Sequence, residues 1–195
     1  MIENPEKIYL HELKNILLRL SLLSENIEDK ELKKKIEKEL ISIDKLAKSH
    51  FSKEKFDLIE LVKELSETRD IKVKKYVNKV FTELNYEKIK MLIGNIISNQ
   101  DKYGKKIKKI NFILKDNFVI EFINDGVTPD ENEIDLLFEF GNRSRKVLDS
   151  YSGDGVGLFI AKKIANEVGV DISYKVINSE NNISLTFRSN SFYVE

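Results

Sequence analysis

Three alternating glycines stand directly before an apolar helical pattern. Gly153, Gly155 and Gly157 are followed by Leu158, and the run continues as Phe-Ile-Ala-Lys-Lys-Ile. Glycine adopts positive φ readily, so such a run can turn several backbone N–H groups toward one point. The N-terminus of the helix adds unpaired N–H donors and a partial positive charge. The combination predicts an anion site, usually for phosphate, although glycine-rich turns also arise for packing alone.

Two asparagines and a lysine recur at helical spacing within the segment 87–103. Asn95, Asn99 and Lys102 lie at i, i+4 and i+7, so a helix places them on one face. Amide oxygens and an ammonium group suit Mg²⁺ and phosphate oxygens. The competing interpretation is a solvated helix face in a chain rich in asparagine and lysine.

A polar turn follows the strand pattern at 118–123. It begins Asn124-Asp125-Gly126. A polar side chain at the end of this strand could accept a hydrogen bond from an adenine amino group. Asp-Gly is also a common turn pair, so an ordinary strand-ending turn is the alternative.

A basic segment lies between this turn and the glycine run. Over 137–146, two phenylalanines precede a glycine and then Arg143, Arg145 and Lys146. This order is typical of a mobile lid anchored by its aromatic residues, with cations available to phosphates. A solvated loop is the competing interpretation.

A histidine stands near the start of the chain. The apolar stripe of the first helical pattern begins at Leu13, so His11, Glu12 and Asn15 lie on its flank, where they can be exposed. A neutral imidazole can act as a nucleophile through a ring nitrogen. A surface histidine without a chemical role is the plain alternative.

The chain that must position these residues changes character near residue 52. Apolar residues at spacings of three and four over 13–27 and 32–50 predict a helical hairpin within 1–52. Each helix has only a narrow stripe, so two copies in a homodimer would close a four-helix bundle. Residues 53–195 mix helical and alternating patterns and predict an α+β domain with one sheet covered by helices. Its expected elements are helices over 56–65, 87–103, 134–138 and 158–168, and strands over 71–77, 110–114, 118–122, 170–176 and 183–187.

Composition narrows the functional classes. Lys and Arg number 33 and so do Asp and Glu, and this balance argues against a dedicated nucleic-acid binder. The absence of cysteine excludes disulfides and thiolate metal sites. No apolar run is long enough to span a membrane, and no signal-peptide pattern opens the chain. We therefore expect a cytoplasmic protein.

The order and spacing of these segments resemble the catalytic core of two-component sensor histidine kinases. In that family a dimerisation hairpin carries the phospho-accepting histidine, and a GHKL-type ATPase domain, a Bergerat-type α/β sandwich, follows it. Residues 11–15 resemble the H box and 95–103 the N box. The first glycine box is expected at 124–128, 138–140 resemble the aromatic segment before the lid, and 153–158 resemble the second glycine box.

The resemblance implies which residues bind ATP and Mg²⁺. Asn99 is the preferred Mg²⁺ ligand and Asn95 the second, Lys102 contacts phosphate, and the glycine amides hold the phosphates. The full set that it assigns to the nucleotide is Asn95, Asn99, Lys102, Tyr103, Asn124, Gly126, Arg143, Gly153, Gly155, Gly157 and Leu158.

It also implies a phosphotransfer function. His11 would take the γ-phosphoryl group of ATP, with Glu12 holding the useful tautomer of its ring. The group would pass to an aspartate of a response regulator, and Asn15 would orient a water that hydrolyses the regulator's phospho-aspartate. Two other functions stay open: a histidine phosphotransferase with a degenerate ATPase domain, and a non-catalytic dimeric adaptor.

The first glycine box departs from the family pattern. Asn124 replaces the adenine-binding aspartate and Thr128 replaces the second glycine, so only Gly126 matches. An asparagine carbonyl can still accept from the adenine amino group, but the lost charge weakens binding by about 1 kcal/mol. Asp125 cannot take over the role, because strand alternation points it to the other side.

Overall fold

The computed structural model describes residues 53–74, 77–139, 141–147, 155 and 157–194, with Lys30 besides. The chain divides between residues 52 and 53 into two units. The helical hairpin expected in the first unit, with His11, lies outside the described residues. The second unit begins at Lys53 and contains all the strands and helices described.

A five-stranded sheet forms one layer of the domain. Its order is β2-β4-β5-β7-β6, and all neighbours are antiparallel except β2 and β4. A turn at 115–117 joins β4 to β5, between the two strands predicted over 110–114 and 118–122. The strands are β2 Lys72–Lys74, β4 Lys108–Leu114, β5 Phe118–Asn124, β6 Asp171–Ile177 and β7 Glu180–Phe187.

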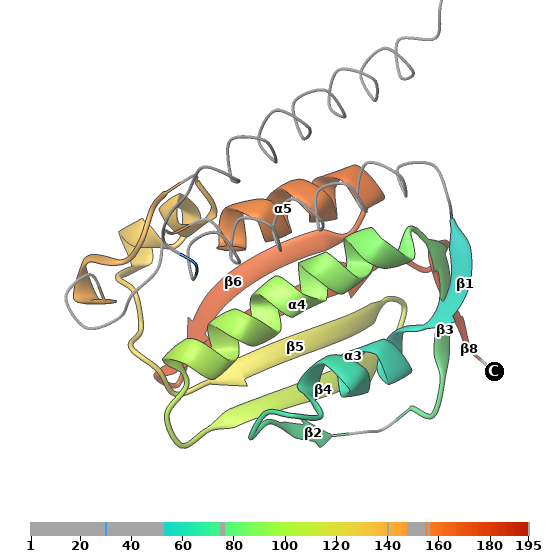
Figure 1. Cartoon of the computed structure of the whole chain (residues 1–195), viewed down its shortest axis with the longest axis horizontal. Helices are drawn as coiled ribbons and strands as arrows, with labels where there is room; N and C mark the ends of the chain where they lie inside the picture. The colour runs from blue at the N-terminus through green and yellow to red at the C-terminus, as the bar shows by residue number, and fades with distance from the viewer. Residues whose placement is uncertain are drawn as a thin grey trace, which may run out of the picture. The chain divides into compact units, whose positions relative to one another are not determined.

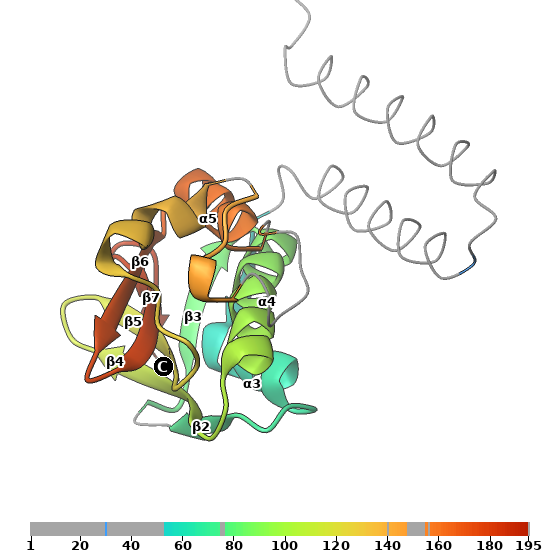
Figure 2. The ribbon, with the colours of Figure 1, turned by 90° about the vertical axis from the view of Figure 1, so that its left-hand side faces the viewer.

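Three helices cover one face of this sheet (Figure 1, Figure 2). They are α3 Leu58–Ser66, α4 Tyr86–Tyr103 and α5 Gly157–Val168. Alternate residues of β5 point into the layer between helices and sheet, and there Phe118, Ile120 and Phe122 are buried. The predicted α+β sandwich is confirmed for this domain. As predicted, α5 ends before Gly169, whose φ of +74° terminates the helix.

A small three-stranded sheet was not predicted. It consists of β1 Glu54–Asp57, β3 Val80–Leu84 and β8 Tyr193–Val194, in the order β1-β3-β8. The expected helix over 56–65 therefore begins two residues late, at Leu58. Its first two expected residues pair instead with β3, where Phe56 lies opposite Thr82.

Short 3₁₀ helices occupy the segment between β5 and α5. The expected helical piece at 134–138 is the 3₁₀ helix η2 Asp135–Phe138, preceded by η1 Glu131–Glu133 and followed by η3 Arg145–Val147. In the part of the chain that the structure describes, no helix is long and apolar enough to cross a membrane.

Asp57 joins the small sheet to α3. Its Oδ1 accepts hydrogen bonds from the backbone N–H of Ile59, at 2.9 Å, and of Val80, at 3.2 Å. The first bond caps the helix. We predict that Asp57→Ala lowers the free energy of unfolding by about 1–2 kcal/mol.

Urea unfolding followed by circular dichroism measures this loss. The matched control is Glu54→Ala on the same strand, at an exposed position, which should change stability by less than about 0.5 kcal/mol. Equal stability of Asp57→Ala and the unsubstituted protein would show that the cap contributes nothing.

Candidate functional site

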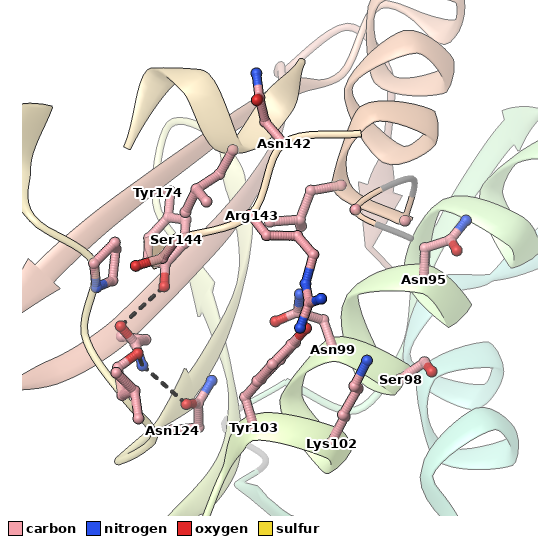
Figure 3. Close-up of a pocket in the computed structure, with 17 residues that line it drawn as sticks. Asn95, Ser98, Asn99, Lys102, Tyr103, Asn124, Asn142, Arg143, Ser144 and Tyr174 are labelled. Carbon is pink, nitrogen blue, oxygen red and sulfur yellow. Dashed lines mark hydrogen bonds between the residues drawn. The ribbon is translucent and has the colours of Figure 1, made fainter. Parts of the chain in front are cut away.

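A cavity of about 250 Å³ lies beside α4, the start of α5 and the ends of three strands (Figure 3). Most residues that the sequence assigns to a nucleotide line it. The lining comprises Asn95, Ser98, Asn99, Lys102, Tyr103, Asn124, Val127, Pro129, Leu137, Asn142, Arg143, Ser144, Gly155, Gly157, Leu158, Tyr174 and Asn181. Of the predicted set, Gly126 is not part of this lining, although its backbone N–H bonds to Asn124, and Gly153 lies outside the described residues.

The polar face of α4 supplies one wall. The opposite face of the helix is buried, which turns Asn95, Asn99 and Lys102 toward the cavity. The Asn95 Nδ2 donates to the carbonyl of Met91 at 3.0 Å, so its Oδ1 remains as an acceptor. That oxygen lies 3.7 Å from where a Cβ on Gly157 would stand, beside the start of α5.

The donor set fits a hard cation only together with phosphate. Among the described residues, no three His, Cys, Asp or Glu side chains gather as a metal site. A Mg²⁺ ion beside α4 would therefore rely on the amide oxygens of Asn99 and Asn95 and on phosphate and water oxygens, which are its usual ligands.

The second wall is the start of α5. Gly155 has a φ of +67°, and a Cβ on it would fall 2.7 Å from the carbonyl carbon of Gly141. Only glycine lets the chain pass that close to the backbone of the lid segment. Gly157 and Leu158 then begin the helix at the cavity, so its partial positive charge faces the enclosed space.

The third wall is a row of polar side chains on three adjacent strands. Asn124 on β5 lies directly opposite Asn181 on β7. The Oδ1 of Asn124 accepts from the N–H of Gly126, at 3.0 Å, and from the Nδ2 of Asn181, at 3.1 Å. The hydroxyl of Tyr174, on β6, donates to the Oδ1 of Asn181 at 2.9 Å.

This row corrects one expectation. The carbonyl of Asn124 was predicted to accept from a ligand's amino group. Both of its lone pairs are used inside the protein, so the amide nitrogen is the atom that remains for a ligand. Asn181 and Tyr174 were not predicted as site residues, because only the strand register brings them beside Asn124.

The lid segment gives one cation to the cavity and keeps two outside its lining. The Arg143 side chain reaches toward Asn99 and Tyr103 (Figure 3). Arg145 and Lys146, which were also expected to be available to phosphates, are not part of the cavity lining. Both lie beside acidic residues of the preceding turn. Lys146 Nζ pairs with Asp130, and Arg145 Nε lies 3.7 Å from Glu133 Oε1, although the Arg145 side chain is 91% exposed.

Glu133 fastens the lid segment to that turn. Its carboxylate accepts from the hydroxyl of Ser144 at 2.7 Å and from the backbone N–H of Arg145 at 3.3 Å. The Ser144 hydrogen bond is the main reason that the pKa of Glu133 lies below its usual value. Phe138 packs against the core, and Lys162 Nζ lies 5.6 Å from its ring centre, as expected for an aromatic anchor. Phe140 lies outside the described residues.

Asp125 points away from the cavity, as strand alternation predicted. Its carboxylate accepts from the backbone N–H groups of Lys105, Lys106 and Ile107 at 2.9–3.1 Å. Burial raises the pKa of Asp125, but these hydrogen bonds outweigh that effect and hold the pKa below its ordinary value. The residue therefore secures the loop that leads from α4 into β4.

Comparison with known proteins identifies the domain. Residues 85–191, more than half of the chain, match the family described as histidine kinase-, DNA gyrase B- and HSP90-like ATPases, and the chain belongs to that family. The curated relatives that it resembles are named as sensor histidine kinases. The sensor histidine kinase YkoH of Bacillus subtilis is 29% identical over 154 residues, which cover 73% of this chain and 33% of YkoH.

Solved structures show the same fold. The catalytic domain of histidine kinase ThkA matches with a TM-score of 0.59 and 18% identity, over 71% of this chain and 97% of that one. Full-length ShkA, solved in complex with AMPPNP, matches with a TM-score of 0.61 and 10% identity, over 98% of this chain and 46% of ShkA. The chain thus spans about a third of YkoH and under half of ShkA.

The loop bound by Asp125 gives a pH-dependent prediction. Asp125→Asn lowers the free energy of unfolding at pH 7 by about 1 kcal/mol, because the amide nitrogen that replaces one carboxylate oxygen cannot accept a hydrogen bond. The folded pKa of Asp125 is depressed, so its stabilisation is present above the unfolded pKa and disappears as pH falls through the folded one. The gap between variant and unsubstituted protein should therefore shrink at acid pH.

Urea unfolding at several pH values from about 6 to about 3, the range around the ordinary carboxyl pKa, measures this gap. The control is Asp116→Asn in the exposed β4–β5 turn, which makes the same chemical change without these hydrogen bonds. A gap that stays constant over this range, or an equal loss in the control, would contradict the role of Asp125.

Proposed function

We propose that this chain is the kinase core of a two-component system, which phosphorylates its own His11 from Mg–ATP and passes the phosphoryl group to a response regulator. The observation that carries the proposal is the convergence of Asn95, Asn99, Lys102 and Arg143 with the glycine-bordered start of α5 on one cavity. The match to ATPases of the histidine kinase type supports ATP as the nucleotide. The complex of ShkA with an ATP analogue supports it as well.

The phosphates belong at the end of the cavity formed by α4 and α5. There the helix start offers N–H donors, while Lys102 and Arg143 supply positive charge. Asn99, with Asn95, would hold Mg²⁺, which supplies neutralisation of the phosphate charge. The base belongs at the other end, beside Asn124.

His11 is the proposed nucleophile, although it lies outside the described residues. Its ring nitrogen forms the bond to the γ-phosphorus as the bond to the β–γ bridging oxygen breaks, and ADP leaves with that oxygen. Glu12 accepts a hydrogen bond from the other ring nitrogen, which stabilises the positive charge on the ring. The resemblance of residues 11–15 to the H box supports these roles.

The second transfer and the assembly follow the same resemblance. The phosphoryl group passes from His11 to an aspartate of the regulator. In the opposing phosphatase reaction, Asn15 positions a water that hydrolyses the phospho-aspartate of the regulator. Residues 1–52 would pair two copies of the chain as a homodimer. The relatives named as sensor histidine kinases support a regulator as partner.

The two histidines of the chain provide a matched test of the acceptor. Incubation with γ-labelled ATP and Mg²⁺ should label the unsubstituted protein and His50→Ala, while His11→Ala takes up no label. The bound phosphate should be acid-labile and base-stable, as an N–P bond requires. Persistent labelling of His11→Ala, or loss of label only in His50→Ala, would refute His11 as the acceptor.

A separate prediction concerns the cation. In calorimetric titrations with an ATP analogue, Mg²⁺ should tighten binding to the unsubstituted protein, and Asn99→Ala should lose roughly tenfold of this Mg²⁺-dependent affinity through the loss of one ligand. Asn117→Ala in the β4–β5 turn is the control, since that exposed residue lies outside the cavity lining. An unchanged Mg²⁺ effect in Asn99→Ala would rule out this ligand.

A further inference from the structure

The cavity has two chemically different ends. Lys102, Arg143 and the start of α5 give one end positive charge. At the other end, the Asn181 amide donates to Asn124 at 3.1 Å and to the carbonyl of Val127 at 3.4 Å, which brings these two amides together with the apolar side chain of Val127. A nucleotide therefore places its phosphates at the first end and its flat, partly apolar base at the second. The edge of that base then meets the strand amides.

The orientation of the Asn124 amide follows from one backbone group. The N–H of Gly126 lies 3.0 Å from the Asn124 side chain and can only donate, so the atom that faces it must be the oxygen. The same oxygen lies 3.1 Å from the Asn181 amide, which must then present its nitrogen. Rotating the Asn124 amide by half a turn would bring two donors together at both contacts.

The far end of the chain of hydrogen bonds is consistent with this orientation. With its nitrogen turned to Asn124, Asn181 presents its oxygen to the hydroxyl of Tyr174 at 2.9 Å. Burial raises the pKa of Tyr174, so the hydroxyl keeps the proton that it donates. Every contact in the row therefore has one donor and one acceptor.

The arrangement leaves one donor turned toward the base. Asn124 is only 3% exposed, and its Nδ2 has no hydrogen-bond partner within the described part of the chain. Figure 3 shows this nitrogen on the side of the Asn124 amide away from the dashed bond to its oxygen, toward the side of the cavity where Tyr103 lies. This nitrogen is accessible from the cavity, because it is not among the buried polar atoms that lack a partner. A base that covers it removes its water, and an uncompensated donor is then costly, so the site favours a ligand with an acceptor at this point.

Purines differ in what they offer there. Adenine carries an amino group, a donor, at position 6, whereas hypoxanthine and guanine carry a carbonyl, an acceptor. We propose that Asn124 reads the position-6 edge of the base as a donor, so that this site accepts 6-oxopurine nucleotides at least as well as adenine nucleotides. The inference rests on the proposed nucleotide site and specifies its base preference.

The test compares ADP with IDP, whose bases differ at position 6 and in the proton on N1, and neither of which donates a γ-phosphoryl group. Calorimetric titration of the full chain with Mg²⁺ should give an IDP affinity equal to or above that of ADP. Asn124→Asp restores an acceptor while its second oxygen keeps the bonds from Gly126 and Asn181. This variant should shift the ratio of the two affinities roughly tenfold toward ADP, the size of one hydrogen-bond mismatch.

The control variant is Asn117→Asp, which adds the same charge at the other end of β5, at an exposed turn position, and should leave the ratio unchanged.

Tenfold tighter binding of ADP than of IDP by the unsubstituted protein would overturn the inference, because adenine would then meet the amide through its N1 acceptor. That result would leave the nucleotide site intact. Binding of neither nucleotide would overturn the proposed site and this inference together. The comparison on the unsubstituted protein decides the matter even if a variant fails to fold.

Discussion

The burial of one face of α4 is the constraint on which the site depends. Ile89, Leu92, Ile93, Ile96 and Ile97 are fully buried between the helix and its neighbours, and each stabilises the domain by about 1.5–3 kcal/mol. The side-chain amide of Gln100 adds hydrogen bonds to the carbonyls of Lys109 and Ile123, at 2.9 and 2.8 Å. The rotation of the helix is therefore fixed. Because the helix has 3.6 residues per turn, Asn95, Asn99 and Lys102 then lie on the opposite face, which lines the cavity.

The end of β5 makes the matching half of the site with three successive residues. Asn124 faces the cavity, Asp125 faces the α4–β4 loop, and Gly126 lies so close to α4 that a Cβ would stand 2.2 Å from the carbonyl oxygen of Tyr103. This close contact explains why Gly126 is the one position of the first glycine box that matches the family. Its backbone N–H sets the amide of Asn124, and through it the polar row across β7 and β6.

The sequence predicts those elements that are long enough to show a hydrophobic repeat or that end at a recognisable turn. The 18-residue α4, the β4–β5 hairpin and α5 with its terminal glycine each show a repeat or a turn that needs no knowledge of distant residues. The small sheet has strands of two to five residues, too short for a repeat, and its first strand continues into the apolar pattern of α3. Short pairing between distant segments therefore escaped prediction.

The residues of the site fall into the same two groups, those that the sequence predicts and those that depend on contacts between distant segments. The residues on one helix face, or beside the glycine run, follow from spacing alone. Asn181 and Tyr174 enter the site through the register of β5, β7 and β6, which places Asn181 opposite Asn124 although the two are 57 residues apart in the sequence. The pairing of Arg145 and Lys146 with acidic residues depends on how the lid segment folds back on the turn before it. Neither the strand register nor this folding back of the lid segment can be inferred from the spacing of residues along the chain.

Amide NMR signals of the glycines test the central claim most directly, because glycines stand both at the cavity and away from it. On addition of a non-hydrolysable ATP analogue with Mg²⁺, the signals of Gly155 and Gly157, which line the cavity, should shift, while those of Gly94 and Gly169, outside the lining, stay in place. Unmoved signals in the first group, or equal shifts in both groups, would contradict a nucleotide site between α4, α5 and the end of β5.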